Sequence, residues 1–279
     1  PWTLPANAAV CLMPDADYVM VQVDGSNVIF AKELVEEVAE IAGWEDYSLV
    51  CGQDGQPVGL KGTELCGLTY TCPIRQDLKG KIIYGDHVTL DSGTGCVHTA
   101  PGHGQDDYLV GLQFDIPILM PVDDNGVLTE DAGPFAGLDT DDANPVIIDW
   151  LREQGTLVAA RKISHSYPHC WSCHEPVIFR ATDQWFVSME ENGLRGKAMD
   201  AIKRDVTFYP GWAVNRIGSM VSDRPDWCIS RQRSWGVPIP VFKCAKCGNT
   251  VATAETFDAV IELFNTKGAD AWFTEAPSD

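Results

Sequence analysis

The residues best suited to chemistry lie close together in one stretch, Gly93–Tyr108, which reads GTGCVHTAPGHGQDDY. This stretch contains two of the six histidines, an Asp pair and four glycines. Glycine adopts backbone conformations that other residues avoid, so a ligand can approach the main chain closely, as at Gly102. The composition predicts a small polar pocket in which a carboxylate binds a cationic group and a histidine contacts the same ligand.

The same stretch has a simpler structural interpretation, because the apolar run Tyr108–Ile118 predicts a helix whose first turn is Gln105–Asp107. A carboxylate in a first turn is favoured by the helix dipole and can cap free N–H groups. On spacing alone, a capped turn with a surface histidine fits as well as a pocket. Asp106 and Asp107 compete for the two roles, and His103 fits a turn residue better than a catalyst.

Length and charge limit the classes of function. A chain of 279 residues has room for about two domains, and no apolar run approaches the ~20 residues of a membrane span. The formal net charge is -20, but residues 1–160 contain 6 basic and 26 acidic residues, whereas residues 161–247 contain 13 and 8. Phosphate groups are bound by Lys and Arg, so residues 161–247 are the expected surface for a nucleic acid.

Ten cysteines without a secretory signal indicate a reducing compartment. Four of them form two Cys-x-x-Cys pairs, Cys170 with Cys173 and Cys244 with Cys247, and this spacing is typical of zinc ligands. One shared site, two separate half-sites and no metal at all are compatible with the spacing.

Periodicity and turn residues predict a mixture of helices and short strands. The first half is predicted to contain a hairpin at 18–30, a helix at 31–42, a compact barrel-like group of strands within 48–100, a strand at 116–122, a helix at 139–154 and a strand at 157–160. Further helices are predicted at 189–203, 215–221 and 254–264.

Three segments carry a resemblance to a known family. The Gly93–Tyr108 stretch resembles the core of the editing site of isoleucyl-tRNA synthetases, and Pro1–Asn7, PWTLPAN, resembles the end of that family's threonine-rich editing segment. Arg224–Pro240 contains an ISRQ core shared with valyl-tRNA synthetases, but its continuation RSWGVPIP favours the isoleucyl enzyme. The corresponding region of a valyl enzyme is the alternative.

The resemblance implies a role for several residues. Asp107 matches the carboxylate that binds the α-ammonium group of a wrongly attached amino acid, and His98 matches the residue that flanks its side chain and excludes isoleucine. Thr3 and Asn7 match positions around the bound ester. Two further substrate-binding positions are expected at Gly102 and Asp106. Water is the expected nucleophile.

The resemblance also implies a domain plan of mixed α/β class. Residues 1–160 would form a β-barrel-like editing domain with flanking helices that hydrolyses valyl-tRNA(Ile). Residues 161–223 would be a connective segment with the first cysteine pair, and residues 224–279 would return toward a Rossmann-type catalytic domain with the second pair. In the family, each pair more often belongs to a separate zinc site that is completed by cysteines elsewhere.

The chain starts inside PWTLP without an initiator Met, so a fragment of a cytoplasmic, monomeric isoleucine-tRNA ligase is expected. Its partners would be tRNA(Ile) and valine or isoleucine esters of that tRNA, with no membrane. ATP and Mg²⁺ would belong to the parent protein only, because the family's HIGH and KMSKS motifs are absent from this sequence. A different interpretation is a zinc-stabilised tRNA-docking module without activity.

Overall fold

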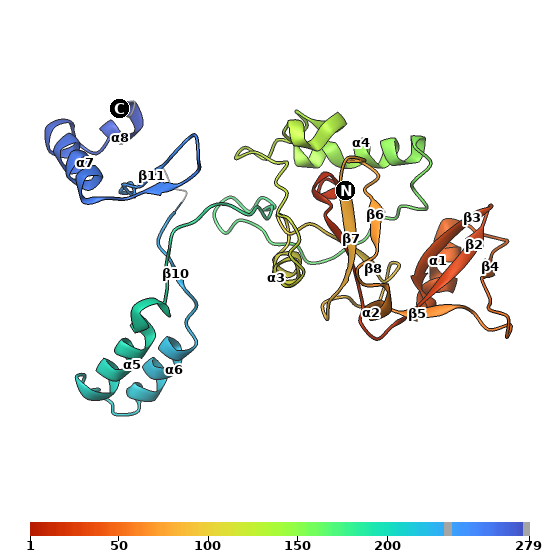
Figure 1. Ribbon diagram of the computed structural model, residues 1–279, viewed down its shortest axis with the longest axis horizontal. Coiled ribbons are helices and arrows are strands. Elements are labelled where there is room, and N and C mark those ends of the chain that lie inside the picture. The colour runs from red at the N-terminus through yellow and green to blue at the C-terminus, as the bar shows by residue number, and fades with distance from the viewer. Residues whose placement is uncertain (232–235, 276–279) are drawn as a thin grey trace. The chain divides into compact units, whose positions relative to one another are not determined.

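The computed structural model describes residues 1–231 and 236–275 of the chain (Figure 1). Gln232–Trp235, which belong to the segment Arg224–Pro240, lie outside the described residues. The chain forms two compact units, residues 1–182 and residues 183–279. The predicted mixed α/β class is confirmed, and the division at residues 160 and 223 stays a prediction about domains.

The first unit contains a four-stranded sheet with the order β6-β7-β1-β8. Its strands are β6 (Thr69–Thr71), β7 (Lys79–Tyr84), β1 (Ala9–Leu12) and β8 (Cys96–Thr99). Strand β1 pairs in parallel with β7 and antiparallel with β8, where Val10 lies opposite His98. Strand β1 is thus an inner strand, and the short 3-10 helix η1 (Leu4–Ala6) comes directly before it in the chain.

A second sheet in the same unit is built around the predicted hairpin, which is confirmed. Strand β2 (Asp17–Val23) pairs with β3 (Ser26–Ala31), and also with β4 (Ser48–Leu49) and β5 (Gly59–Lys61). The predicted helix at 31–42 divides into η2 (Lys32–Leu34) and α1 (Val35–Ala42). It ends at Gly43, whose φ of 69° is a left-handed conformation that glycine adopts readily.

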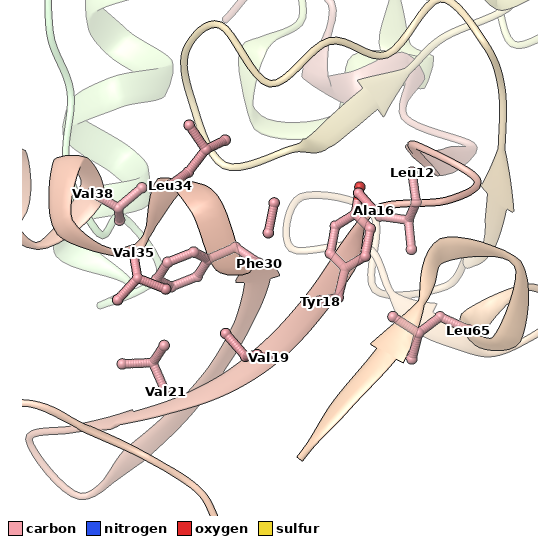
Figure 2. Close-up of a cluster of buried hydrophobic side chains, with 11 residues drawn as sticks. Leu12, Ala16, Tyr18, Val19, Val21, Phe30, Leu34, Val35, Val38 and Leu65 are labelled. Atoms are coloured by element: carbon pink, nitrogen blue, oxygen red, sulfur yellow. The ribbon is translucent and has the colours of Figure 1, made fainter. Parts of the chain in front are cut away.

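The core of this second sheet lies between its strands and α1 (Figure 2). Its buried side chains are Leu12, Ala16, Tyr18, Val19, Val21, Phe30, Ala31, Leu34, Val35, Val38 and Leu65. The Tyr18 hydroxyl donates to the Gly95 carbonyl at 2.6 Å and accepts from the Met13 N–H at 2.8 Å. Tyr18 thus connects β2 to the loop that leads into β8.

The remaining helices of the first unit are α2 (Gly62–Leu65), α3 (Gln105–Gln113), η3 (Glu130–Phe135) and α4 (Thr140–Glu153). Helix α4 confirms the prediction at 139–154, and the Asp139 carboxylate caps it by accepting from the Asp141 N–H at 2.9 Å. Ile147 of α4 and Phe135 of η3 are fully buried.

Three expectations about strands are wrong. The segments 116–122 and 157–160 form no named strand, and only an isolated bridge joins Val122 to Leu128. Pro117 and Pro121 have no N–H to donate to a sheet, which explains the first case. The barrel-like group is two open sheets, and among the described residues the strands do not close into a barrel.

Residues 161–182 are part of the first compact unit. Arg161 pairs with Glu37 at 3.0 Å, and Arg180 pairs with Asp124 at 2.9 Å. The Ala181 N–H donates to the Gly102 carbonyl at 2.8 Å. These contacts attach the first cysteine-bearing segment to the unit that contains His98.

The second unit contains short paired strands and two groups of helices. Strands β9 (Phe186–Val187) and β10 (Trp227–Cys228) pair, as do β11 (Phe242–Lys243) and β12 (Thr250–Val251). The 3-10 helix η4 (Glu191–Gly193) leads into α5 (Leu194–Arg204), which packs on α6 (Ala213–Ser222), while α7 (Ala254–Lys267) packs on α8 (Ala271–Thr274). In the part of the chain that the structure describes, no helix has the length and apolarity needed to cross a membrane.

Candidate functional site

The candidate site is centred on His98, which lies in β8 beside the start of the chain. The Thr3 Oγ1 atom is 3.1 Å from His98 Nε2, and the Asn7 Nδ2 atom is 2.7 Å from His98 Nδ1. Thr3 precedes η1 and Asn7 follows it, so the single turn Leu4–Ala6 places one side chain on each ring nitrogen. Three residues that were predicted from the resemblance are therefore in direct contact.

His98 is uncharged at neutral pH. Its pKa is lowered to about 4, chiefly by burial and to a smaller extent by the N-terminal amine and His103. A neutral imidazole can donate through one nitrogen and accept through the other, and it can pack against an apolar side chain. Its state suits a residue that shapes a pocket better than one that carries a positive charge.

Asp107 lies in the first turn of α3, as predicted, and its side chain folds back toward the strand. Its Oδ2 atom accepts a hydrogen bond from the Ala100 N–H at 2.8 Å. A Cβ atom on Gly104 would be 2.9 Å from the Asp107 Cγ atom, so the glycine leaves room for this conformation. Burial raises the pKa of Asp107 because it disfavours the charged carboxylate. A cationic ligand beside the carboxylate would counteract this by stabilising the charged form.

Asp106 faces a different environment from its neighbour. It is exposed and lines a hollow of about 240 Å³. The other lining residues are Tyr84, Gly85, Asp86, His87, Leu109, Val110 and Gln113. The expected N-cap of α3 is occupied by Gly104, so Asp106 is not the capping residue.

Gly102 is required by packing. A Cβ atom at Gly102 would lie 2.3 Å from the Leu119 carbonyl oxygen, far inside van der Waals contact. Its own carbonyl accepts from the Ala181 N–H at 2.8 Å. The main chain at Gly102 is thus already held by protein contacts on both sides.

His103 is a structural residue, in agreement with the prediction of a turn position. It is buried, its Nδ1 atom lies 3.0 Å from the Phe179 carbonyl oxygen, and its ring packs edge-on against Trp2 with centroids 4.8 Å apart. Burial lowers the pKa of His103. Its contacts join the start of the chain to the segment before residue 182.

Two features near the site were not predicted. The Tyr70 hydroxyl donates a hydrogen bond to the Asn7 Oδ1 atom. Burial and the charge of Asp107 raise the pKa of the Cys11 thiol to about 12, so Cys11 is no thiolate nucleophile. Tyr70 could not have been found from sequence spacing, because β6 reaches Asn7 only through strand pairing.

The two cysteine pairs lie in turns of the same design. The Cys170 N–H donates to the Glu175 carbonyl and the His174 N–H donates to the Cys170 carbonyl, at 2.8 and 2.9 Å. In the second turn, the Cys244 N–H donates to the Asn249 carbonyl and the Gly248 N–H donates to the Cys244 carbonyl, both at 2.8 Å. Backbone N–H groups of Cys247 and Lys246 lower the pKa of the Cys244 thiol.

A tetrahedral zinc site needs four ligands, and each turn supplies two thiols. Among the described residues, no group of three or more His, Cys, Asp or Glu side chains is arranged to hold a metal ion. The half-site interpretation of each cysteine pair therefore stays a prediction.

Comparison with known proteins identifies the family. A family model described as "tRNA synthetases class I (I, L, M and V)" matches residues 17–279. The chain belongs to the class I tRNA synthetases. Its curated relatives are named isoleucine–tRNA ligase, which confirms the resemblance to the isoleucyl enzymes.

Two of these relatives show how much of a synthetase is represented. The chain is 47% identical over all 279 residues to the protein of Kosmotoga olearia, of which it covers 29%. It is 48% identical over 273 residues, or 98% of the chain, to the protein of Moorella thermoacetica, of which it covers 28%. The chain thus spans less than a third of the length of these class I synthetases.

A solved structure described as the crystal structure of GlLeuRS-CP1 is also similar. It shares 15% identity at a TM-score of 0.46, over 58% of this chain and 82% of that one. A TM-score this low does not establish that the two proteins share a fold.

Proposed function

We propose that this chain is the part of an isoleucine-tRNA ligase that hydrolyses valyl-tRNA(Ile), the product of attaching the wrong amino acid. Isoleucine and valine differ by one methylene group, which yields only about 1–3 kcal/mol of discrimination in a binding pocket. A second pocket that accepts valine and excludes isoleucine corrects the remaining errors.

The observation that carries this proposal is the connection between His98 and Asp107. Asp107 is hydrogen-bonded to Ala100, two residues after His98 along the same strand and turn. A carboxylate that can bind an α-ammonium group is thus attached to the end of the strand that contains a neutral imidazole, which can limit the size of a side chain. An amino acid held by both groups would present its ester bond to the Thr3 hydroxyl.

In the proposed reaction, water attacks the ester carbonyl and the tRNA hydroxyl leaves. Asp107 binds the ammonium group, His98 excludes the larger isoleucyl side chain, and Thr3 with Asn7 orients the ester. The substrate contacts expected of Gly102 and Asp106 stay predictions; Asp106 is exposed and lines a separate hollow, so its carboxylate is not needed to bind the ammonium group. Cys11 does not compete with water, because its thiol stays protonated.

The remaining predictions are proposals of the same kind. We propose that the parent protein is a cytoplasmic monomer that binds tRNA(Ile), and that ATP and Mg²⁺ are bound by parts of it other than this chain. Residues 224–279 would lead back toward its Rossmann-type catalytic domain. Each cysteine pair would form half of a separate zinc site, because each lies in a self-contained turn with two thiols.

Deacylation of valyl-tRNA(Ile) by this chain tests the proposal, with isoleucyl-tRNA(Ile) as the competing substrate. Selective release of valine, abolished in Asp107→Ala and retained in Asp106→Asn, would support it. Equal release of both amino acids, or release that is indifferent to Asp107→Ala, would contradict it.

A zinc-stabilised RNA-docking module without activity is the second candidate. The excess of 13 basic over 8 acidic residues in 161–247, the segment that contains both cysteine pairs, favours it. Salt-dependent binding of tRNA(Ile) by a chain that releases no valine would be its signature.

A further inference from the structure

A line of hydrogen bonds crosses the first sheet and ends at Thr3. Tyr70 lies on the edge strand β6 opposite Gly80 of β7, Asn7 lies just before β1, and His98 lies on β8. The line runs from the Tyr70 hydroxyl to Asn7 Oδ1, from Asn7 Nδ2 to His98 Nδ1, and from His98 Nε2 to Thr3 Oγ1. All four strands of the sheet contribute to its placement.

The direction of each hydrogen bond follows from the orientation of the Asn7 amide. Its Nδ2 atom lies 3.1 Å from the Ala9 carbonyl oxygen, which can only accept, so this contact and the one from Tyr70 favour the same orientation of the amide. The Oδ1 atom then faces Tyr70, whose hydroxyl donates to it. Burial raises the pKa of Tyr70 well above its usual range, so the hydroxyl keeps its proton.

The Asn7 amide in turn determines which ring nitrogen of His98 is protonated. An N–H group points at Nδ1 from 2.7 Å, so Nδ1 must be the acceptor. A neutral imidazole has a single N–H, which therefore lies on Nε2 and donates to Thr3 Oγ1. Since the Thr3 oxygen accepts this hydrogen bond, its own hydroxyl hydrogen can be donated to another acceptor.

We propose that Tyr70 is a positioning residue: through Asn7 it fixes the Nε2–H tautomer of His98 and makes the Thr3 hydroxyl a hydrogen-bond donor to the ligand. Tyr70 acts through Asn7 and touches no substrate. The part that concerns the ligand rests on the proposed function, in which Thr3 donates to an oxygen of the aminoacyl ester. The tautomer of His98 is a property of the unliganded chain.

Gly80 explains how the tyrosine reaches Asn7. A Cβ atom at Gly80 would lie 2.2 Å from the Tyr70 Cζ atom and 2.4 Å from its hydroxyl oxygen. The Tyr70 ring therefore lies across Gly80, in space that any other residue would fill. Gly80→Ala would displace the Tyr70 hydroxyl without removing it.

The first experiment reads the tautomer directly. Nitrogen-15 NMR of the chain, labelled at histidine and free of RNA, should show an unprotonated Nδ1 and a protonated Nε2 for His98 at pH 7. His98→Gln assigns the signals. Asn7→Asp replaces the N–H by a second acceptor and should move the proton to Nδ1. A protonated Nδ1 in the unmodified chain would overturn the proposal.

The second experiment isolates Tyr70. Tyr70→Phe should admit a measurable share of the Nδ1–H tautomer and lower kcat for valyl-tRNA(Ile) roughly tenfold, the effect of one lost hydrogen bond, with KM within about twofold. Gly80→Ala should reproduce both changes. Tyr47→Phe, at an exposed tyrosine just before β4, should change neither.

The outcomes separate this inference from the proposed function. A folded Tyr70→Phe variant with unchanged nitrogen shifts and unchanged kcat would show that Tyr70 positions nothing. If the unmodified chain releases no valine, the proposed function fails. The nitrogen shifts of His98 in that chain, in Tyr70→Phe and in Gly80→Ala still decide whether Tyr70 fixes the tautomer.

Discussion

The Asp107 carboxylate accepts a hydrogen bond from the Ala100 N–H at 2.8 Å. This bond joins the first turn of α3 to the end of β8, where His98 is located. One oxygen atom of the carboxylate is thereby held by the protein, while the other can meet a ligand. The bond also explains why Asp107, and not the exposed Asp106, fits the role of the anchoring group.

Asp107→Asn should abolish most of the activity and leave the fold intact. The amide oxygen can still accept from Ala100, but the charge that binds an ammonium group is gone. A hydrogen bond to a charged group contributes up to about 3 kcal/mol, so kcat/KM for valyl-tRNA(Ile) should fall roughly 100-fold. Thermal unfolding and deacylation rates measure the two effects. Asp106→Asn is the matched control, and an equal loss in both variants would contradict the assignment.

His98 should make stability depend on acidity. Its pKa is lowered from 6.5 to about 4 on folding, so the unfolded chain binds the extra proton between these values. The free energy of unfolding should therefore be highest above pH 6.5 and should fall by about 2–3 kcal/mol as the pH drops toward 4. Urea titrations at several pH values measure this slope. His98→Gln should lack this contribution, and an identical slope in that variant would refute the assignment.

Gly102→Ala should destabilise the first unit because the new methyl group would meet the Leu119 carbonyl oxygen at 2.3 Å. Overpacking of this kind costs about 1–3 kcal/mol. Gly196→Ala makes the same chemical change in α5, where a Cβ atom has open space, and should stabilise the helix by about 0.5–1 kcal/mol. Chemical denaturation of both variants measures the difference, and a neutral Gly102→Ala would show that this turn can relax.

Tyr18→Phe should cost about 2–4 kcal/mol, because it leaves both the Gly95 carbonyl and the Met13 N–H without their buried partner. Tyr47→Phe removes the same atom from an exposed ring and should change the free energy of unfolding by less than about 0.5 kcal/mol. Equilibrium unfolding in urea compares them. Similar values for both variants would mean that the Tyr18 hydroxyl contributes nothing.

The two cysteine pairs should bind metal independently of each other. If each pair is half of its own site, Cys244→Ser should leave cobalt absorption at Cys170 and Cys173 unchanged, and Cys170→Ser should leave the other pair unchanged. A shared site would lose the whole signal in either variant. Absorption spectra of the cobalt-loaded chain decide, because the thiolate-to-cobalt bands report how many sulfur atoms bind.

Local sequence predicted the elements that local interactions determine. The hairpin at 18–30, the helix ended by Gly43, the helix at 139–154 and the first turn of α3 are all present. Helix α5 begins at Leu194 and not at 189, because Asn192 and Gly193 adopt left-handed conformations just before it. Turn residues and periodicity contain the information needed for these assignments.

Strand partners could not be predicted in the same way. Pairing of Ala9 with Lys81, and of Val10 with His98, joins residues far apart in sequence, so no local pattern indicates it. Thr3, Asn7 and His98 were selected by resemblance, and the structure brings them together. Tyr70 was missed, because its contact with Asn7 exists only once β6, β7 and β1 have paired.

The interior position of β1 has a consequence for the order of folding. Its neighbours on the two sides are β7 and β8, so residues 9–12 leave the ribosome long before residues 79–84 and 96–99 exist. Thr3 and Asn7 are made early but reach His98 only after this long loop closes, and closing such distant contacts is slow. The pocket is therefore assembled late in folding, and a chain truncated before Cys96 would leave one edge of β1 unpaired and open to aggregation.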